Sequence, residues 1–199
     1  MNLKSNIKGF LGERKVRKFL KNHQKKLNAK TLNNVKLNIN GKTIQIDHIF
    51  ITPYKVYVIE TKNLNGAILG KISDSYWTIC YKNNKNYKIL NPIIQNTYHV
   101  KVIESITKIP AQNVLIFTGK ANTCNLNNYY INTLKNFEKE LNNESFFKFL
   151  TSFNNVERIY NLIKSNLSSF SKKQHIINIE NRPKSKYKKS NYYKKNLPF

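Results

Sequence analysis

Acidic residues are scarce in this chain, which carries 10 Asp and Glu against 35 Lys and Arg and so has a formal net charge of +25. A surface this basic attracts polyanions, nucleic acid first. The chain is also rich in Asn, Lys, Ile and Tyr, which AT-rich coding sequence favours, so part of the Lys content has a second explanation. Such a bias does not account for the shortage of Glu, whose codons can also be AT-rich. We therefore expect a functional polyanion-binding surface.

Cysteines are also few, and long apolar runs are missing. Cys80 and Cys124 do not form a Cys-x-x-Cys pair, which excludes a zinc ribbon and makes a disulfide framework unexpected. The first residues, MNLKSNIKGFLGE, have no long apolar core and so do not resemble a signal peptide. No apolar run approaches the roughly 18 residues that are needed to span a membrane. We expect a soluble, cytoplasmic protein without a membrane partner.

The length of 199 residues fits one domain with appendages. We expect this domain over residues 1–168 and a basic C-terminal arm over residues 169–199. From Asn181 to Phe199 the chain has seven Lys or Arg, four aromatic residues and no acid, which is typical of a flexible arm. Such an arm can bind single-stranded or duplex nucleic acid, or it can serve only to keep the protein soluble.

Apolar periodicity predicts an α/β fold. The segment Leu3–Leu27 has apolar residues at helical spacing, with Lys and Arg between them. Asn91-Pro92 is a capping residue followed by proline and predicts a helix that continues to about Thr107. Asn40-Gly41 predicts a two-residue hairpin turn between antiparallel strands. The expected strands are Val35–Ile39, Lys42–Ile51, Tyr54–Lys62, Tyr76–Tyr81, Asn113–Thr118 and Tyr129–Leu134, and two further helices are expected at Asn143–Thr151 and Asn155–Leu167.

Two of these strands carry charged residues within the most apolar part of the chain. Asp47 lies in the strand Lys42–Ile51, and Glu60 and Lys62 end the next strand. If the turn between the strands is centred on the bond between residues 53 and 54, Asp47 lies directly opposite Glu60, and Lys62 shares the face of Glu60. A slip of one residue would break this arrangement.

Two adjacent carboxylates repel each other and favour a cation between them. Lys62 could be that cation, in which case the group is a buried salt-bridge cluster. The alternative is a divalent metal, because Mg²⁺ takes hard oxygen ligands, commonly one or two carboxylates with water and substrate phosphate. Asp47 and Glu60 fit that description. His48 points to the opposite face of its strand from Asp47 and is expected to pack rather than to bind a metal.

Two helical residues are further candidates for the same site. Glu13 is the only acid among the first 46 residues, and its spacing from Phe10, Val16 and Leu20 places it on the predicted buried stripe of the first helix. It could assist the two carboxylates or simply pair with a basic residue one turn later. Gln95 lies in the first turn of the helix that begins at residue 92, where it could donate to a phosphate, orient a lysine or face solvent.

Several short motifs occur in order along the chain. They are Gly12-Glu13, Ile46-Asp47-His48, Ile59-Glu60-Thr61-Lys62-Asn63, Gly66, Gly70, Trp77, Asn91-Pro92 and Gln95. In this order they resemble the nuclease-related domain (NERD), a branch of the PD-(D/E)xK nuclease superfamily, and the similarity covers about Gly9–Thr118. Ile46 stands where the superfamily name has Pro.

The resemblance implies a restriction-endonuclease-like core, in which helices flank a central mixed sheet. It implies that Asp47 and Glu60 bind Mg²⁺ or Mn²⁺, with Glu13 assisting from the helix. Lys62 would position or activate the attacking water, and Gln95 would support Lys62 or the scissile phosphate. The expected activity is metal-dependent hydrolysis of phosphodiester bonds, of DNA in preference to RNA. The alternative is a non-catalytic nucleic-acid-binding protein that keeps the fold and uses its charge.

Overall fold

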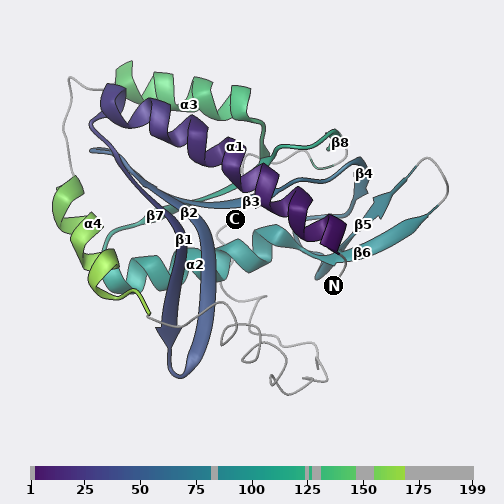
Figure 1. The fold of residues 1–199 in the computed structure, drawn as a ribbon, viewed down its shortest axis with the longest axis horizontal. Coiled ribbons are helices and arrows are strands. Elements are labelled where there is room, and N and C mark those ends of the chain that lie inside the picture. Colours follow the sequence, from purple (N-terminus) through teal and green to yellow (C-terminus); the bar gives the residue numbers. More distant parts are fainter. Residues whose placement is uncertain (1–2, 82–84, 124–125, 127–130, 147–154, 169–199) are drawn as a thin grey trace.

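A five-stranded sheet forms the centre of the molecule, in the order β1-β2-β3-β7-β9 (Figure 1). The computed structural model describes residues 3–81, 85–123, 126, 131–146 and 155–168. The first three strands are antiparallel neighbours, whereas β7 and β9 join in parallel, so the sheet is mixed. The strands are β1 (Lys30–Ile39), β2 (Lys42–Ile51), β3 (Val56–Lys62), β7 (Ala111–Phe117) and β9 (Ile131–Asn132).

Helices cover both faces of this sheet, with α1 and α3 on one face and α2 and α4 on the other (Figure 1). Side chains alternate along β3 between the two cores: Tyr57 packs with α1 and α3, whereas Val58 packs with α2 and α4. The predicted α/β class, a mixed sheet flanked by helices, is confirmed. The helices are α1 (Leu3–Leu27), α2 (Pro92–Thr107), α3 (Leu134–Phe146) and α4 (Val156–Ser165). None of those described combines the length and the apolar character that crossing a membrane would take.

A second, four-stranded sheet lies at one end of the molecule, in the order β6-β5-β4-β8 (Figure 1). Its inner face buries Ile68 and Trp77 against Ile93 of α2 and Leu115 of β7. This contact fixes the small sheet to the first turn of α2. The strands are β4 (Gly66–Leu69), β5 (Tyr76–Cys80), β6 (Asn86–Leu90) and β8 (Ala121–Asn122).

The first helix has the predicted bounds, but its predicted buried stripe is wrong in the first turns. Val16 and Leu20 are fully buried, whereas Ile7, Phe10 and Leu11 are exposed. The reason is that Gly12 already lies against Thr118 and Asn63, which follow the ends of β7 and β3, so the turns of α1 before it extend beyond these two strands.

Two boundaries in the rest of the chain differ from the prediction by five residues or more. β1 begins at Lys30 rather than Val35, and α3 begins at Leu134, well before the predicted start at Asn143. Thr133 caps this helix, because its Oγ1 accepts the N–H of Asn136 at 3.2 Å. The predicted end of this helix at residue 151 and the predicted basic arm over residues 169–199 lie outside the described residues.

The turn between β2 and β3 sets the register of the two strands. Thr52 closes it, because its Oγ1 accepts the N–H groups of Tyr54 and Lys55 and its own N–H donates to the carbonyl of Lys55. Strand pairing then runs without interruption from Ile51↔Val56 to His48↔Ile59. This is the predicted register, and it makes Asp47 and Glu60 the next residues along their strands.

Candidate active site

The candidate site lies at a fork, where β2 separates from β3 beyond the pair His48↔Ile59. On its other side, β2 pairs with β1 at Asn33↔His48 and again at Val35↔Ile46, which leaves Asn34 and Asp47 between the two pairs. Asn34 has φ of +53°, a left-handed conformation that Asn tolerates better than most residues. Asp47 therefore lies outside the regular strand pairing on both sides of β2.

Three charged side chains meet at this fork. The Oδ2 atom of Asp47 accepts the N–H of Thr61 on β3 at 2.8 Å, which fixes Asp47 against the neighbouring strand. The Nζ atom of Lys62 lies 2.6 Å from Oε1 of Glu60, and the Glu60 side chain is only 5% exposed. The structure thus brings Asp47, Glu60 and Lys62 together, as the register predicted, and Lys62 is the cation already in contact with Glu60.

Ionisation of Asp47 is disfavoured in this position. Burial raises the pKa of Asp47 well above its ordinary value, the neighbouring charges of Glu60 and Glu13 raise it further, and the hydrogen bond from Thr61 and the charge of Lys62 oppose the shift. A group held in this way gains from any additional cation nearby. A cation placed beside Asp47 would therefore favour its ionised form.

Lys62 holds its proton firmly. Burial by itself would lower the pKa of Lys62, but Glu60, followed by Asp47 and Glu13, outweighs that effect and raises the pKa above its ordinary value. Beside these carboxylates Lys62 is therefore positively charged at neutral pH. Its chemistry suits the stabilisation of negative charge.

Gly12 is what allows Glu13 to reach the site from α1. A Cβ atom at Gly12 would lie 2.7 Å from Oγ1 of Thr118 and 2.8 Å from Cβ of Asn63, which follow the ends of β7 and β3. The side chain of Asn63 also donates to the carbonyl of Lys8 at 2.7 Å, so the helix is held to the end of β3. Glu13 is half-buried there, within electrostatic range of Asp47 and Lys62.

Replacing Gly12 with Ala is expected to destabilise the fold by about 1–3 kcal/mol, because the added methyl group forces α1 away from the strand ends. Gly9 in the same helix is the matched control: a Cβ atom there meets nothing within 4 Å, so Gly9→Ala is expected to stabilise by about 0.5–1 kcal/mol. Urea unfolding of the two variants measures both effects. Equal stability of the two variants would contradict the close contact at Gly12.

His99 on α2 is a site residue that the sequence reasoning missed. It is 5% exposed, and its Nδ1 atom lies 3.9 Å from Oε2 of Glu60. Burial lowers the pKa of His99, opposed by Glu60 and reinforced by Lys62, so the ring is neutral at pH 7. A signal was present, because position 99 follows Gln95 by four residues and so lies on the same side of the helix.

Gln95 is half-buried in the first turn of α2, one turn before His99. The contact from α2 to Glu60 that the structure shows comes from His99. The role of Gln95 toward Lys62 or a phosphate therefore stays a prediction. The side chain of Asn96 holds α2 against the sheet, because it donates to the carbonyl of Val58 at 2.8 Å and to Asn113 Oδ1 at 2.7 Å.

His48 lies apart from the carboxylates, as expected from strand alternation. It is fully buried, and its Nδ1 atom lies 2.7 Å from Oδ1 of Asn33 on the paired strand. Burial, reinforced by the charge of Arg17, lowers the pKa of His48 to about 3, so its ring is neutral at pH 7. His48 therefore supports β2 from the face opposite to Asp47.

The carboxylates of the site are not a preformed three-ligand metal centre. Within the described ranges, no three His, Cys, Asp or Glu side chains are grouped so that they could hold a metal ion. The donors nevertheless suit Mg²⁺ or Mn²⁺, since both ions prefer carboxylate oxygens. Mg²⁺ in particular commonly binds through one or two carboxylates and keeps several waters. Asp47 and Glu60 meet that requirement, with Glu13 close by.

Comparison with known proteins agrees with the geometry. The nuclease-related domain (NERD) family matches residues 8–118, more than half of the chain. An uncharacterized protein of Bacillus anthracis is 40% identical over 101 residues, and the match covers 49% of this chain and 45% of that protein, so the chain spans less than half the length of this relative. No solved structure matches the chain. The chain therefore belongs to the nuclease-related domain family.

Proposed function

We propose that the protein is a metal-dependent nuclease of the PD-(D/E)xK type, which hydrolyses phosphodiester bonds of DNA in preference to RNA. The observation that carries the proposal is the meeting of Asp47, Glu60 and Lys62 at the fork between β2 and β3. A buried pair of carboxylates beside a protonated lysine is costly for a protein to maintain, which favours a chemical role over a structural one. The net charge of +25 supports a polyanionic substrate.

Each side chain of the site has a role in this proposal. Asp47 and Glu60 would hold Mg²⁺ or Mn²⁺, with Glu13 assisting from α1. The ion would supply polarisation of the phosphoryl oxygen and a lower pKa of bound water. Lys62 stabilises the negative charge that develops on the phosphate during attack.

The helix α2 supplies the supporting groups in this proposal. The Nδ1 atom of His99 lies 3.9 Å from Oε2 of Glu60, whereas Lys62 contacts Oε1 of the same carboxylate. Glu60 is thereby held between a cation and a neutral ring. Gln95, one turn earlier, supports Lys62 or the scissile phosphate.

A cleavage assay tests the proposed function. Labelled single-stranded, duplex and branched DNA and RNA are incubated with the purified protein in Mg²⁺, in Mn²⁺ and in EDTA. We expect cleavage with either metal, none in EDTA, and recovery when Mg²⁺ is added back. The Asp47→Asn variant, purified in the same way, distinguishes the protein's own activity from a contaminating nuclease. Cleavage that persists in EDTA would contradict the proposal.

A second candidate function is nucleic-acid binding without catalysis. It is favoured by one observation: Glu60 already has Lys62 as a partner at 2.6 Å, so the cluster can stand without a metal. In that case binding would fall steeply with salt but would not depend on Asp47, Glu60 or a divalent metal. The absence of cleavage on all four substrates in both metals, together with such binding, would favour this candidate.

A further inference from the structure

The outer face of the small sheet carries exposed apolar and basic side chains. Ile68, Trp77 and Ile79 point inward and are at most 3% exposed. Because side chains alternate along a strand, their sequence neighbours point outward. We define this outer face by the residues Leu69, Tyr76, Thr78, Lys88 and Leu90.

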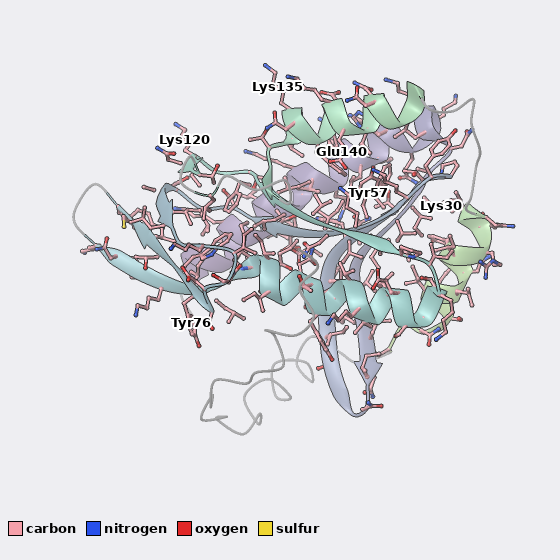
Figure 2. The ribbon with its side chains drawn as sticks, turned by 180° about the vertical axis from the view of Figure 1, so that it is seen from behind. Lys30, Tyr57, Tyr76, Lys120, Lys135 and Glu140 are labelled. Carbon is pink, nitrogen blue, oxygen red and sulfur yellow. The ribbon has the colours of Figure 1, made fainter. Side chains whose placement is uncertain are left out.

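Strand pairing makes the outer face continuous. Tyr76 pairs directly with Leu90, and Thr78 pairs with Lys88 on one side and with Leu69 on the other. Tyr76 is 52% exposed, Leu90 44% and Leu69 42%. Figure 2 shows Tyr76 at the periphery of the molecule, beside the small sheet. Leu69, Tyr76, Leu90 and Lys88 thus lie around Thr78 on one exposed sheet surface.

The surroundings of this face are basic. Lys71 and Lys85 are exposed on either side of β5, in addition to Lys88 on the face itself. Asp74 is the only acid between residues 66 and 90, and its Oδ2 atom already accepts the N–H of Lys71 at 2.8 Å. An occupant that carries negative charge is therefore favoured over an uncharged or basic one. A second copy of this chain, also at +25, would be repelled.

The apolar centre decides which polyanion fits. Duplex nucleic acid presents phosphates and hides the flat faces of its bases, so it gains little from Tyr76, Leu69 and Leu90. A single strand exposes base faces that stack on an aromatic ring, while its phosphates reach nearby lysines. We propose that the outer face of the small sheet binds single-stranded nucleic acid, with a base stacked on Tyr76 and a phosphate near Lys88.

The location connects this surface to the candidate site. Leu90 ends β6, and Asn91 caps α2 directly after it, with its N–H donated to the carbonyl of Ser75 at 3.0 Å. Gln95 and His99 follow within two turns of the same helix. This inference rests on the proposed function in one respect: the single strand that binds here is taken to be the substrate that the candidate site cleaves.

Binding without cleavage tests the inference separately. Fluorescence anisotropy of a labelled oligothymidylate is measured in EDTA with the full chain, beside a duplex that contains the same strand. The double variant Tyr76→Ala/Lys88→Gln is expected to bind the single strand about tenfold more weakly and the duplex nearly unchanged. Tyr76→Phe keeps the ring and should bind within about twofold of the wild type. The matched control is Tyr54→Ala/Lys55→Gln, which removes the same residue types from the turn before β3.

The outcomes separate the alternatives. An equal loss for single strand and duplex would overturn the inference in favour of general charge attraction, as would an equal loss in the control variant. Unchanged binding of oligothymidylate by the Tyr76→Ala/Lys88→Gln variant would also overturn the inference. If sedimentation then showed that the wild type self-associates and this variant does not, the face would be assigned to a second copy of the chain. Absent cleavage with intact single-strand binding would contradict the proposed function and leave the binding surface established. Thermal unfolding of both double variants checks that each is folded.

Discussion

Replacing Asp47 with Asn is expected to abolish cleavage and, in the absence of metal, to make the protein more stable. The amide oxygen can still accept the N–H of Thr61, so the geometry of the fork is kept. The neutral side chain no longer supplies a charged ligand, which should cost about a thousandfold or more in rate. It also removes a carboxylate whose ionisation is disfavoured by burial and by Glu60, which should raise stability by about 1 kcal/mol.

The stability gain of Asp47→Asn should depend on pH in a defined direction. Because the pKa of Asp47 is raised in the folded state, the unfolded chain loses this proton first as the pH rises. The wild type therefore loses stability from about pH 4 upward until the raised folded pKa is passed, whereas the variant lacks this loss. Thermal unfolding between pH 4 and 8 measures the difference, which should be near zero at the acid end and largest at the neutral end.

Added Mg²⁺ provides the control for this prediction. Metal binding should stabilise the wild type and not the variant, because only the native state of the wild type offers both carboxylates. The stability gap should then shrink or reverse. A variant that is less stable than the wild type at pH 7 in EDTA would show that Asp47 is a structural residue and not a strained ligand.

Replacing Lys62 with Met should lower the stability of the fold, and by more than the changes expected for Gly12→Ala and Asp47→Asn. The Glu60 side chain is 5% exposed and that of Lys62 is 25% exposed, so removal of Lys62 leaves a buried carboxylate without its cation. Breaking a buried ion pair from one side costs about 3 kcal/mol or more. Urea unfolding measures the loss. Cleavage by this variant is informative only under conditions in which the variant is folded.

The double variant Glu60→Gln/Lys62→Met is the matched control. It removes both charges of the pair, so Glu60 is no longer a buried carboxylate without its cation, and most of the lost stability should return. Activity should not return, because a metal ligand and the fixed positive charge are both gone. Recovery of stability without activity would separate the structural cost of the cluster from its chemical use. If Lys62→Met instead lowered the free energy of unfolding by less than about 1 kcal/mol, the Glu60–Lys62 pair would behave like a surface ion pair that solvent screens.

Helix caps and turn residues in the sequence predicted correctly the features of the fold that depend on neighbouring residues. The bounds of α2 follow from its cap, because the side chain of Asn91 accepts the N–H of Ile93 at 2.9 Å and Pro92 occupies the first turn. The hairpin turn at Asn40-Gly41 has φ of +51° and +76°, the values that a type I′ turn requires. The register of β2 and β3 followed from the position of their turn.

What the sequence could not provide depends on contacts between distant segments. The apolar residues at the start of α1 look like a core stripe, and only the positions of β3 and β7 show that Phe10 lies beyond the sheet. The strand β6 was missed because its side chains are mostly exposed, so no alternation marks it. His99 was missed because its partner Glu60 lies far away in the chain, and the spacing from Gln95 does not by itself indicate that contact.

The turn at Thr52 determines where Asp47 and Glu60 lie along their strands. Asp47 and Glu60 reach the fork together because the same number of residues separates each of them from that turn. Substitutions within the turn should therefore be tolerated far better than changes in its length. An insertion of one residue would displace one carboxylate by a strand position and move it to the opposite face. Among related chains, loop length at this point should vary less than loop sequence.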